Sequence, residues 1–132
     1  MHARRNKFDP LWNSIVIAGR DATGTNFLGF VDLLGTSFRE TVVATGYGAA
    51  LALPLMRAAV DALPPNTLLT RDAAKALLER CMRVLFYRDA RALNKIQLAD
   101  VSDAGVSVTE PYSLPTDWQF GERVSHAAEG SW

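Results

Sequence analysis

Hydrophobic positions in the first part of the chain fall into three short runs that are typical of β-strands. Residues 14–18 carry β-branched side chains, residues 27–34 are mostly apolar, and residues 37–44 contain an aromatic residue and two valines. Turn-forming residues separate the runs at positions 21–24 and 35–36. Short runs joined by tight turns predict an antiparallel meander of three strands.

The apolar pattern becomes helical after Thr45. Residues 48–63 are apolar on nearly every side, which predicts a buried helix. Pro54 fits this helix only if it stands in the first turns, because further along it must kink the helix. A second helix is predicted over residues 71–88, with Thr70 as its N-cap and its apolar residues on one face.

Two more strands are predicted over residues 95–101 and 106–109, around a turn at residues 102–105. The tail that starts at Pro111 is polar and has no strong periodicity before a predicted short helix over residues 117–126. Three strands, two adjacent helices and two strands do not alternate as βαβ units do. This order predicts one α+β domain, with the helix pair covering one face of a sheet.

Composition excludes several classes of protein. The chain has 132 residues, enough for one domain, and its 14 basic and 14 acidic side chains give zero net charge, unlike a strongly basic nucleic-acid or membrane-surface protein. Residues 49–56 are too short an apolar run to cross a bilayer, and residues 15–18 are too short for a signal peptide. A single cysteine, Cys81, cannot form an internal disulfide, so we expect an intracellular, reducing compartment.

One motif imitates a phosphate-binding loop. Gly46-Tyr47-Gly48 follows a predicted strand and opens a helix, as the glycines of dinucleotide-binding folds do. Leu51 stands where that motif needs a small residue, and no strand is predicted after the helix to supply a ribose-binding acid. We therefore expect these glycines to bend the chain from strand into helix, and we expect no cofactor.

Cys81, His2 and His126 are the remaining candidates for nucleophilic or metal chemistry. Cys81 lies on the apolar face of the second predicted helix, where a thiol is buried and unreactive. The histidines lie near opposite ends of the chain, and one thiol with two scattered histidines cannot build a zinc site. We expect a core cysteine, solvated histidines and no metal site.

Charged residues cluster where the second helix ends. Arg88 and Arg91 suit the negative end of the helix dipole, whereas Asp89 is unfavourable there unless a cation or backbone donors compensate it. The residues alone leave two interpretations open. Asp89 belongs to an ordinary ion-paired helix end, which we favour, or it is an acid held for a site built with residues elsewhere.

Several segments of the chain resemble the beta subunits of the proteasome. They are Pro10-Leu11-Trp12-Asn13, Gly29-Phe30-Val31-Asp32, residues 44–49 and, above all, residues 79–91 with Phe86-Tyr87-Arg88-Asp89-Ala90-Arg91. The resemblance extends from Arg4 to Trp118 and is greatest to the type-4 group of that family. It implies an N-terminal-nucleophile hydrolase fold, a four-layer αββα sandwich. Residues 1–132 would be the C-terminal part of one such domain, without its N-terminal strands and helices.

The resemblance also bears on catalysis. Active members of the family present a serine between two glycines where this chain has Tyr47, and a second serine where it has Ala92. Neither side chain supplies the small-hydroxyl hydrogen bonds that hold a terminal amine and a proton acceptor in position. Asp89 matches the family's acid. An acid without nucleophile and lysine is not an active site, so the resemblance implies a non-catalytic subunit with no catalytic residue, cofactor or metal. The alternative is an active threonine peptidase subunit whose N-terminal half carries the nucleophile.

The implied role is architectural. The chain would be a structural beta subunit of the 20S proteasome core particle, helping to assemble the rings that enclose the chamber for ubiquitin-dependent protein degradation. Its partners would be the other alpha and beta subunits of a 28-subunit complex, in the cytoplasm and nucleus, with no nucleic acid and no membrane. Trp118, Phe120 and Trp132 predict that the tail, residues 111–132, contacts neighbouring subunits. Without the resemblance, the same pattern fits a free-standing α+β ligand-binding domain.

Overall fold

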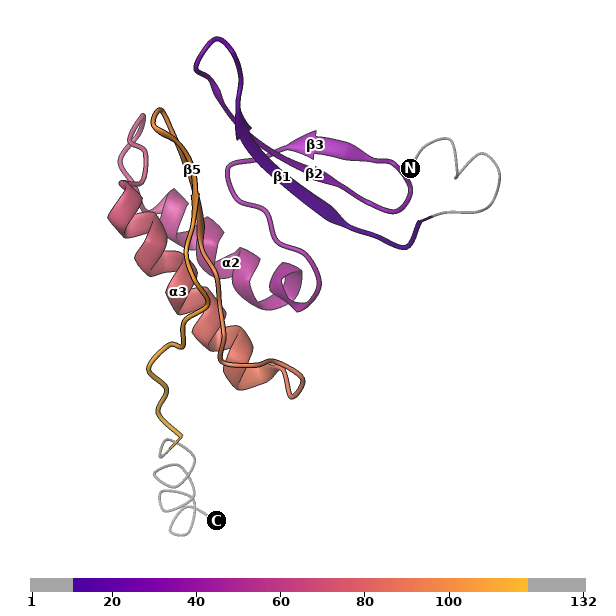
Figure 1. Ribbon diagram of the computed structural model, residues 1–132, viewed down its shortest axis with the longest axis vertical. Helices are drawn as coiled ribbons and strands as arrows, with labels where there is room; N and C mark the ends of the chain where they lie inside the picture. Colours follow the sequence, from indigo (N-terminus) through magenta and orange to yellow (C-terminus); the bar gives the residue numbers. More distant parts are fainter. Residues whose placement is uncertain (1–10, 119–132) are drawn as a thin grey trace.

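The computed structural model describes residues 11–118 and confirms that they form a mixed α and β structure (Figure 1). A three-stranded antiparallel sheet is followed by two helices and a two-stranded hairpin, in the predicted order. The strands are β1 (Ile15–Arg20), β2 (Asn26–Val31), β3 (Ser37–Arg39), β4 (Ala99–Ser102) and β5 (Gly105–Val108). The helices are α2 (Tyr47–Asp61) and α3 (Arg71–Arg88). The helix predicted over residues 117–126 lies, apart from its first two residues, outside the described residues.

Both turns of the three-stranded sheet use the same five-residue pattern, Asp-x-x-Gly-Thr. In the first turn the Asp21 carboxylate accepts hydrogen bonds from the backbone amides of Thr23 and Thr25, at 2.9 and 2.8 Å. In the second turn Asp32 accepts in the same way from the second and fourth residues after it, both at 2.9 Å. The hydroxyl of Thr23 also donates to Asp21, and this hydrogen bond is the main reason why the pKa of the Asp21 carboxyl is lowered. The repeated turn sets the register of all three strands.

The three-stranded sheet is apolar on both faces, and neither face is covered in the described part of the chain. Ile15 and Ile17 of β1 point to one face, whereas Val16 and, from β3, Phe38 point to the other. All four are exposed, and Ile17 keeps 49% of its surface accessible. The prediction that the helix pair covers a face of this sheet is therefore wrong for the described residues. Figure 1 shows the sheet extending away from both helices.

The core lies instead between the two helices. Ala52 and Met56 of α2 pack with Cys81 of α3, and all three are buried. Val42 and Ala44 pack against this cluster from the segment that leads into α2. Their turn towards the helices explains why β3 ends at Arg39, although the strand was predicted to continue to residue 44.

The helix ends follow the sequence signals, with one exception. The Thr70 hydroxyl oxygen accepts a hydrogen bond from the Ala73 amide at 3.3 Å, which confirms the predicted N-cap of α3. Pro54, however, lies in the middle of α2 rather than in its first turns. Proline has no amide hydrogen, so the carbonyl one turn earlier loses its helical partner there. Neither helix in residues 11–118 has the length and apolar content needed to cross a membrane.

The β4–β5 hairpin presents a polar face to α3 and an apolar face away from it. Asp100 on β4 forms an ion pair of 3.0 Å with Arg71 of α3, which sets the orientation of the hairpin. The opposite face is built from valines and an alanine, and Val106 on it is 70% exposed. β4 begins at Ala99, later than predicted, because Ile96 pairs only with Tyr112 in an isolated bridge.

The conformation of Gly24 generates a prediction about the first turn. Its φ of 83° is left-handed, as is the φ of 82° at Gly35 in the second turn. Replacing Gly24 by alanine should cost about 1–2 kcal/mol of unfolding free energy, because a Cβ is strained in that region. Gly19→Ala in β1 is the matched control, since an added Cβ there meets nothing within 4 Å, and we expect a change within about 0.5 kcal/mol. Guanidinium unfolding of dilute protein, followed by circular dichroism, measures both, and equal losses would contradict the turn assignment.

Candidate functional site

The candidate site is the end of the helix pair at which α2 begins and α3 finishes. Gly46 has a φ of 59° and turns the chain into α2. A Cβ on Gly48 would stand 3.3 Å from the Cβ of Ala44 and 3.9 Å from a methyl group of Leu85, one turn before the end of α3. The glycines thus serve a sharp bend and a close helix contact, and α3 rather than a strand follows α2. Both observations favour the structural interpretation of the Gly46-Tyr47-Gly48 motif.

Tyr47 and Asp89 lie at this same end of the helix pair without a hydrogen bond between them. The Tyr47 side chain is 65% exposed, and no residue in the described range donates to or accepts from its hydroxyl. Asp89 is the C-cap of α3, and its carboxylate accepts from the Arg91 amide at 2.9 Å. The Asp89 carbonyl accepts from the Ala92 amide at 3.1 Å.

Asp89 therefore stabilises the loop that ends α3 through its own backbone neighbours. One backbone donor, the Arg91 amide, offsets the negative charge that the helix dipole disfavours at this position. Within residues 11–118 no hydroxyl group donates to the Asp89 carboxylate, and Ala92 offers only a methyl group. The arrangement favours an ordinary helix end over an acid poised for proton transfer. The predicted ion pairing of that helix end is wrong for residues 11–118, where no basic side chain pairs with Asp89.

Cys81 is a core residue, as predicted. Only 2% of its surface is accessible, and its Sγ lies 3.9 Å from the carbonyl oxygen of Ala52, to which it donates a weak hydrogen bond. Burial raises the pKa of the thiol, with the positive charge of Arg80 as a smaller opposing effect. His2 and His126 lie outside the described residues, and residues 11–118 contain no group of three or more side chains placed to hold a metal ion.

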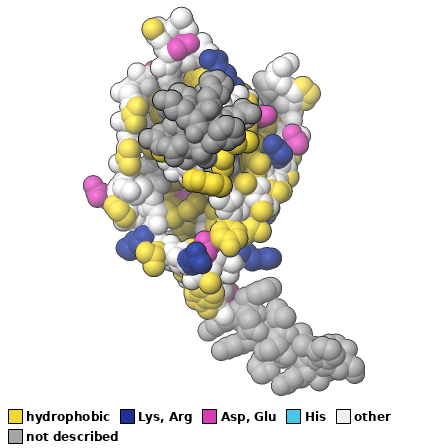
Figure 2. Space-filling view, turned by 90° about the vertical axis from the view of Figure 1, so that its right-hand side faces the viewer, with side chains coloured by type: hydrophobic (Ala, Val, Ile, Leu, Met, Phe, Trp, Pro, Cys, Tyr) yellow, Lys and Arg dark blue, Asp and Glu magenta, His cyan; other side chains and the backbone are white. Residues whose placement is uncertain are grey.

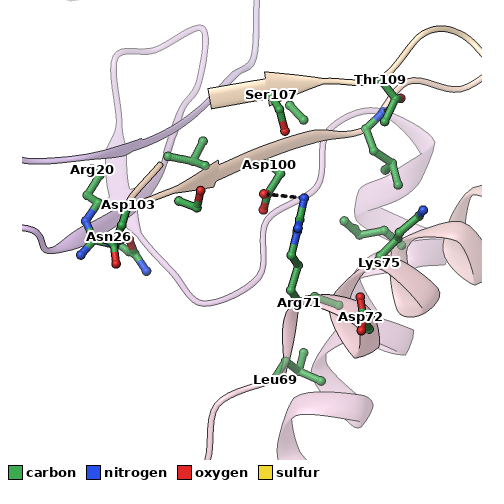
Figure 3. A pocket seen from close by; sticks show the side chains of 16 residues that line it. Arg20, Asn26, Leu69, Arg71, Asp72, Lys75, Asp100, Asp103, Ser107 and Thr109 are labelled. Atoms are coloured by element: carbon green, nitrogen blue, oxygen red, sulfur yellow. Dashed lines mark hydrogen bonds and ion pairs between the residues drawn. The ribbon is translucent and has the colours of Figure 1, made fainter. Parts of the chain in front are cut away.

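A cleft with a volume of about 730 Å³ lies between the first half of α3 and the β4–β5 hairpin. Figure 3 shows charged side chains that enter it from both walls. Arg71 pairs with Asp100 across the cleft, and Arg20 at the end of β1 pairs with Asp103 in the hairpin turn. These opposite charges neutralise each other, so the cleft joins three segments of the chain without offering a net charge to a ligand.

The sequence did not predict that residues 112–118 pack along α3. The Tyr112 hydroxyl donates to Glu79 of α3 at 2.8 Å, and loss of water contact together with this carboxylate raises the pKa of the phenol. Asn94 exchanges two hydrogen bonds with the backbone of Leu114, at 2.8 and 2.9 Å. These partners are up to 33 residues apart, and no local periodicity predicts them. The predicted tail thus begins by packing on its own chain, and Phe120 and Trp132 lie outside the described residues.

Comparison with known proteins identifies the family. Residues 1–101 match the sequence profile of the family described as proteasome subunit. The chain belongs to the proteasome subunit family. Membership implies the N-terminal-nucleophile hydrolase fold, and the described sheets and two helices form a mixed α and β part of such a domain.

The individual relatives to which the chain is similar are beta subunits. It is 46% identical to proteasome subunit beta type-4 of Arabidopsis thaliana, across 100% of this chain and 52% of that protein. It is 42% identical to proteasome subunit beta type-4 of Xenopus laevis, across 95% of this chain and 50% of that protein. Identity to proteasome subunit beta type-7 of Saccharomyces cerevisiae is 37%, across 94% of this chain and 47% of that protein. The chain thus spans about half the length of the relatives that it matches.

The burial of Cys81 generates a prediction about thiol reactivity. Because the raised pKa disfavours the thiolate and the core excludes reagent, alkylation by iodoacetamide at pH 7 should be at least about tenfold slower than in guanidinium-unfolded chain. Met82→Cys in a Cys81→Ala background is the matched control, since Met82 on the same helix is exposed, and it should react at nearly the unfolded rate. Mass spectrometry measures both rates. Equal rates at the two positions would show that Cys81 is not a core residue.

Proposed function

We propose that this protein is a non-catalytic, structural beta subunit of the 20S proteasome core particle. Its role is to help assemble the beta rings that enclose the proteolytic chamber for ubiquitin-dependent protein degradation. Its partners are then the other alpha and beta subunits of a 28-subunit complex, in the cytoplasm and nucleus. The observation that carries the proposal is the match to proteasome beta subunits over nearly the whole chain.

The lack of catalysis is supported by the residues at the end of the helix pair. An active threonine peptidase of this family needs small hydroxyl groups beside its amine and its acid. Tyr47 is a large, exposed side chain at one of these positions, and Ala92 has no hydroxyl at the other. The Asp89 carboxylate accepts a hydrogen bond from the Arg91 amide. This set of residues stabilises a loop but does not position a proton acceptor.

A four-layer αββα sandwich is supported by the apolar surfaces that the described residues leave uncovered on the three-stranded sheet and on the β4–β5 hairpin. A sheet that is apolar on both faces is typical of a sheet covered on both faces. The three-stranded sheet has this character, and the β4–β5 hairpin turns its apolar face away from the helices. Stacking the sheet and the hairpin between helical layers would bury these apolar surfaces. The remaining strands and helices of the sandwich would come from the half of the domain that the relatives have in addition.

Assembly tests this function directly. Tagged chain expressed in its own cells should occur in a particle with the mass and subunits of the 20S core, measured by native mass spectrometry. Its isolation as a free monomer would refute the structural role and favour a free-standing ligand-binding domain. A threonine-type peptidase activity that travels with this chain and is lost on its removal alone would support the active-subunit alternative.

The tail supplies a second test of assembly. We propose that residues 111–132 reach a neighbouring subunit, with Trp118 among the anchors, because aromatic residues are enriched at interface centres. A chain that ends at Pro115 retains the hydrogen bonds of Asn94 to Leu114 but lacks Trp118. It should enter the particle at a yield reduced by about tenfold. Recovery at the yield of the full chain would rule out an assembly role for the tail.

A further inference from the structure

The segment that packs along α3, residues 112–118, is here called the strap, and it is bonded to the helix at two points. The Tyr112 hydroxyl donates to the Glu79 carboxylate at 2.8 Å. Two turns further along α3, the Tyr87 hydroxyl accepts a backbone amide of the strap at 2.6 Å. Arg83 stands four residues from each of these positions, and residues with that spacing lie on the same face of a helix. Arg83 therefore lies between the two points at which the strap is held.

Arg83 is a half-buried cation without a partner. It forms no ion pair or hydrogen bond with any residue in the range 11–118, and its Nε–H is shielded from water without an acceptor. A glutamate four residues before an arginine is the spacing that favours an ion pair on a helix. Glu79 has this spacing, but its carboxylate accepts from Tyr112 instead. The structure thus leaves a costly unsatisfied donor one turn from a carboxylate that is bonded elsewhere.

Other basic side chains of α3 have less to gain from this carboxylate. Arg80 and Arg88 are exposed, and Figure 2 shows Lys and Arg side chains at the surface of the lower end of the molecule. An exposed charge is hydrated and gains little from an ion pair, unlike the half-buried Arg83. Lys75 stands one turn before Glu79, but it is exposed, lines the cleft beside the hairpin (Figure 3), and has the less favourable order of charges.

We propose that Glu79 exchanges between two partners, Tyr112 when the strap lies on α3 and Arg83 when the strap lifts from it. In the lifted state the Arg83 guanidinium binds the carboxylate that the Tyr112 hydroxyl has released. This ion pair offsets part of the free energy lost with the Tyr112 bond, so the strap lifts more readily than it would without Arg83. The exchange itself is a property of this chain. Its use, to free Trp118 for a sister subunit, rests on the proposed function.

The strap can leave α3 without losing its other hydrogen bonds. Asn94 exchanges two hydrogen bonds with the backbone of Leu114, and Ile96 pairs with Tyr112 through two backbone bonds. These bonds join the strap to residues that follow α3 rather than to the helix itself. In the described part of the chain, the hydrogen bonds between the strap and α3 are those of the Tyr112 hydroxyl and the Asp117 amide.

Amide hydrogen exchange of the dilute full chain, followed by NMR, tests the proposal. The Asp117 amide is the reporter, because it is bonded to Tyr87 of α3 only while the strap is in place. Arg83→Met keeps an apolar stem but removes the charge that stabilises the lifted state, so this amide should exchange about threefold more slowly. A purely structural Arg83 would give the opposite sign, since its loss would loosen the strap. Lys75→Met is the matched control, with the same charge and the same spacing from Glu79, and should change the rate less than about 1.5-fold.

Removal of the competing donor supplies the second measurement. Tyr112→Phe should speed exchange of the Asp117 amide by about tenfold. It should also let Arg83 pair with Glu79, so that the Arg83 Nε–H resonance moves downfield as expected for a new hydrogen bond. In this background Arg83→Met should no longer slow the reporter, because the two side chains act through the same carboxylate. Amides beside the buried Cys81 are the internal reference and should keep their rates in every variant.

Four results would overturn the proposal. They are unchanged or faster exchange of the reporter in the Arg83→Met chain, equal slowing by Lys75→Met, an equal effect of Arg83→Met with and without the Tyr112 hydroxyl, and faster exchange of the Cys81 reference in the Arg83→Met chain. The outcome is separable from that of the assembly experiment. The expected rates in a chain that never enters a 20S particle would keep the exchange at Glu79 and remove the proposed function. Normal entry into the particle without any effect of Arg83→Met would do the reverse.

Discussion

A β-sheet with two apolar faces has to be covered on both, and this constraint shapes the rest of the molecule. β1 carries isoleucines on one face and Val16 on the other, so no orientation of the strand can turn its apolar side chains away from water. The helices do not provide the cover, because they bury their apolar residues against each other. At roughly 25 cal/mol for each Å² of apolar surface, uncovered strands leave a large driving force for association. This uncovered apolar surface is the feature that the proposed four-layer sandwich would bury.

The helix pair is the part of the described chain that buries apolar side chains against one another. Its core of Ala52, Met56 and Cys81 joins α2 to α3, and residues 112–118 pack along α3. This arrangement fixes the end of α3, where Asp89 holds the loop and Trp118 is displayed. The ion pair of Arg71 with Asp100 connects α3 to the hairpin, and the ion pair of Arg20 with Asp103 connects β1 to the hairpin.

Features governed by local sequence were predictable. The turn glycines, the Thr70 cap and the apolar face of α3 each depend on residues within a few positions of one another, and the structure has all three. The family could also be inferred, because residues 79–91 form a distinctive block. Long-range placement was not predictable: the helix pair covers no face of the three-stranded sheet, and Tyr112 finds Glu79 from 33 residues away. The interpretation of Asp89 needed the structure as well, since only coordinates show which amide its carboxylate accepts from.

Hydrogen exchange of the backbone amides, compared between dilute monomeric chain and the assembled particle, tests the central claim most directly. Amides of α2 and α3 beside the buried core should exchange slowly in both samples, because their protection arises within this chain. Amides of β1 and β3 should exchange rapidly in the lone chain and become protected by orders of magnitude in the particle. Equal protection of these strands in both samples would contradict the account, because it would show that the sheet needs no cover from another polypeptide.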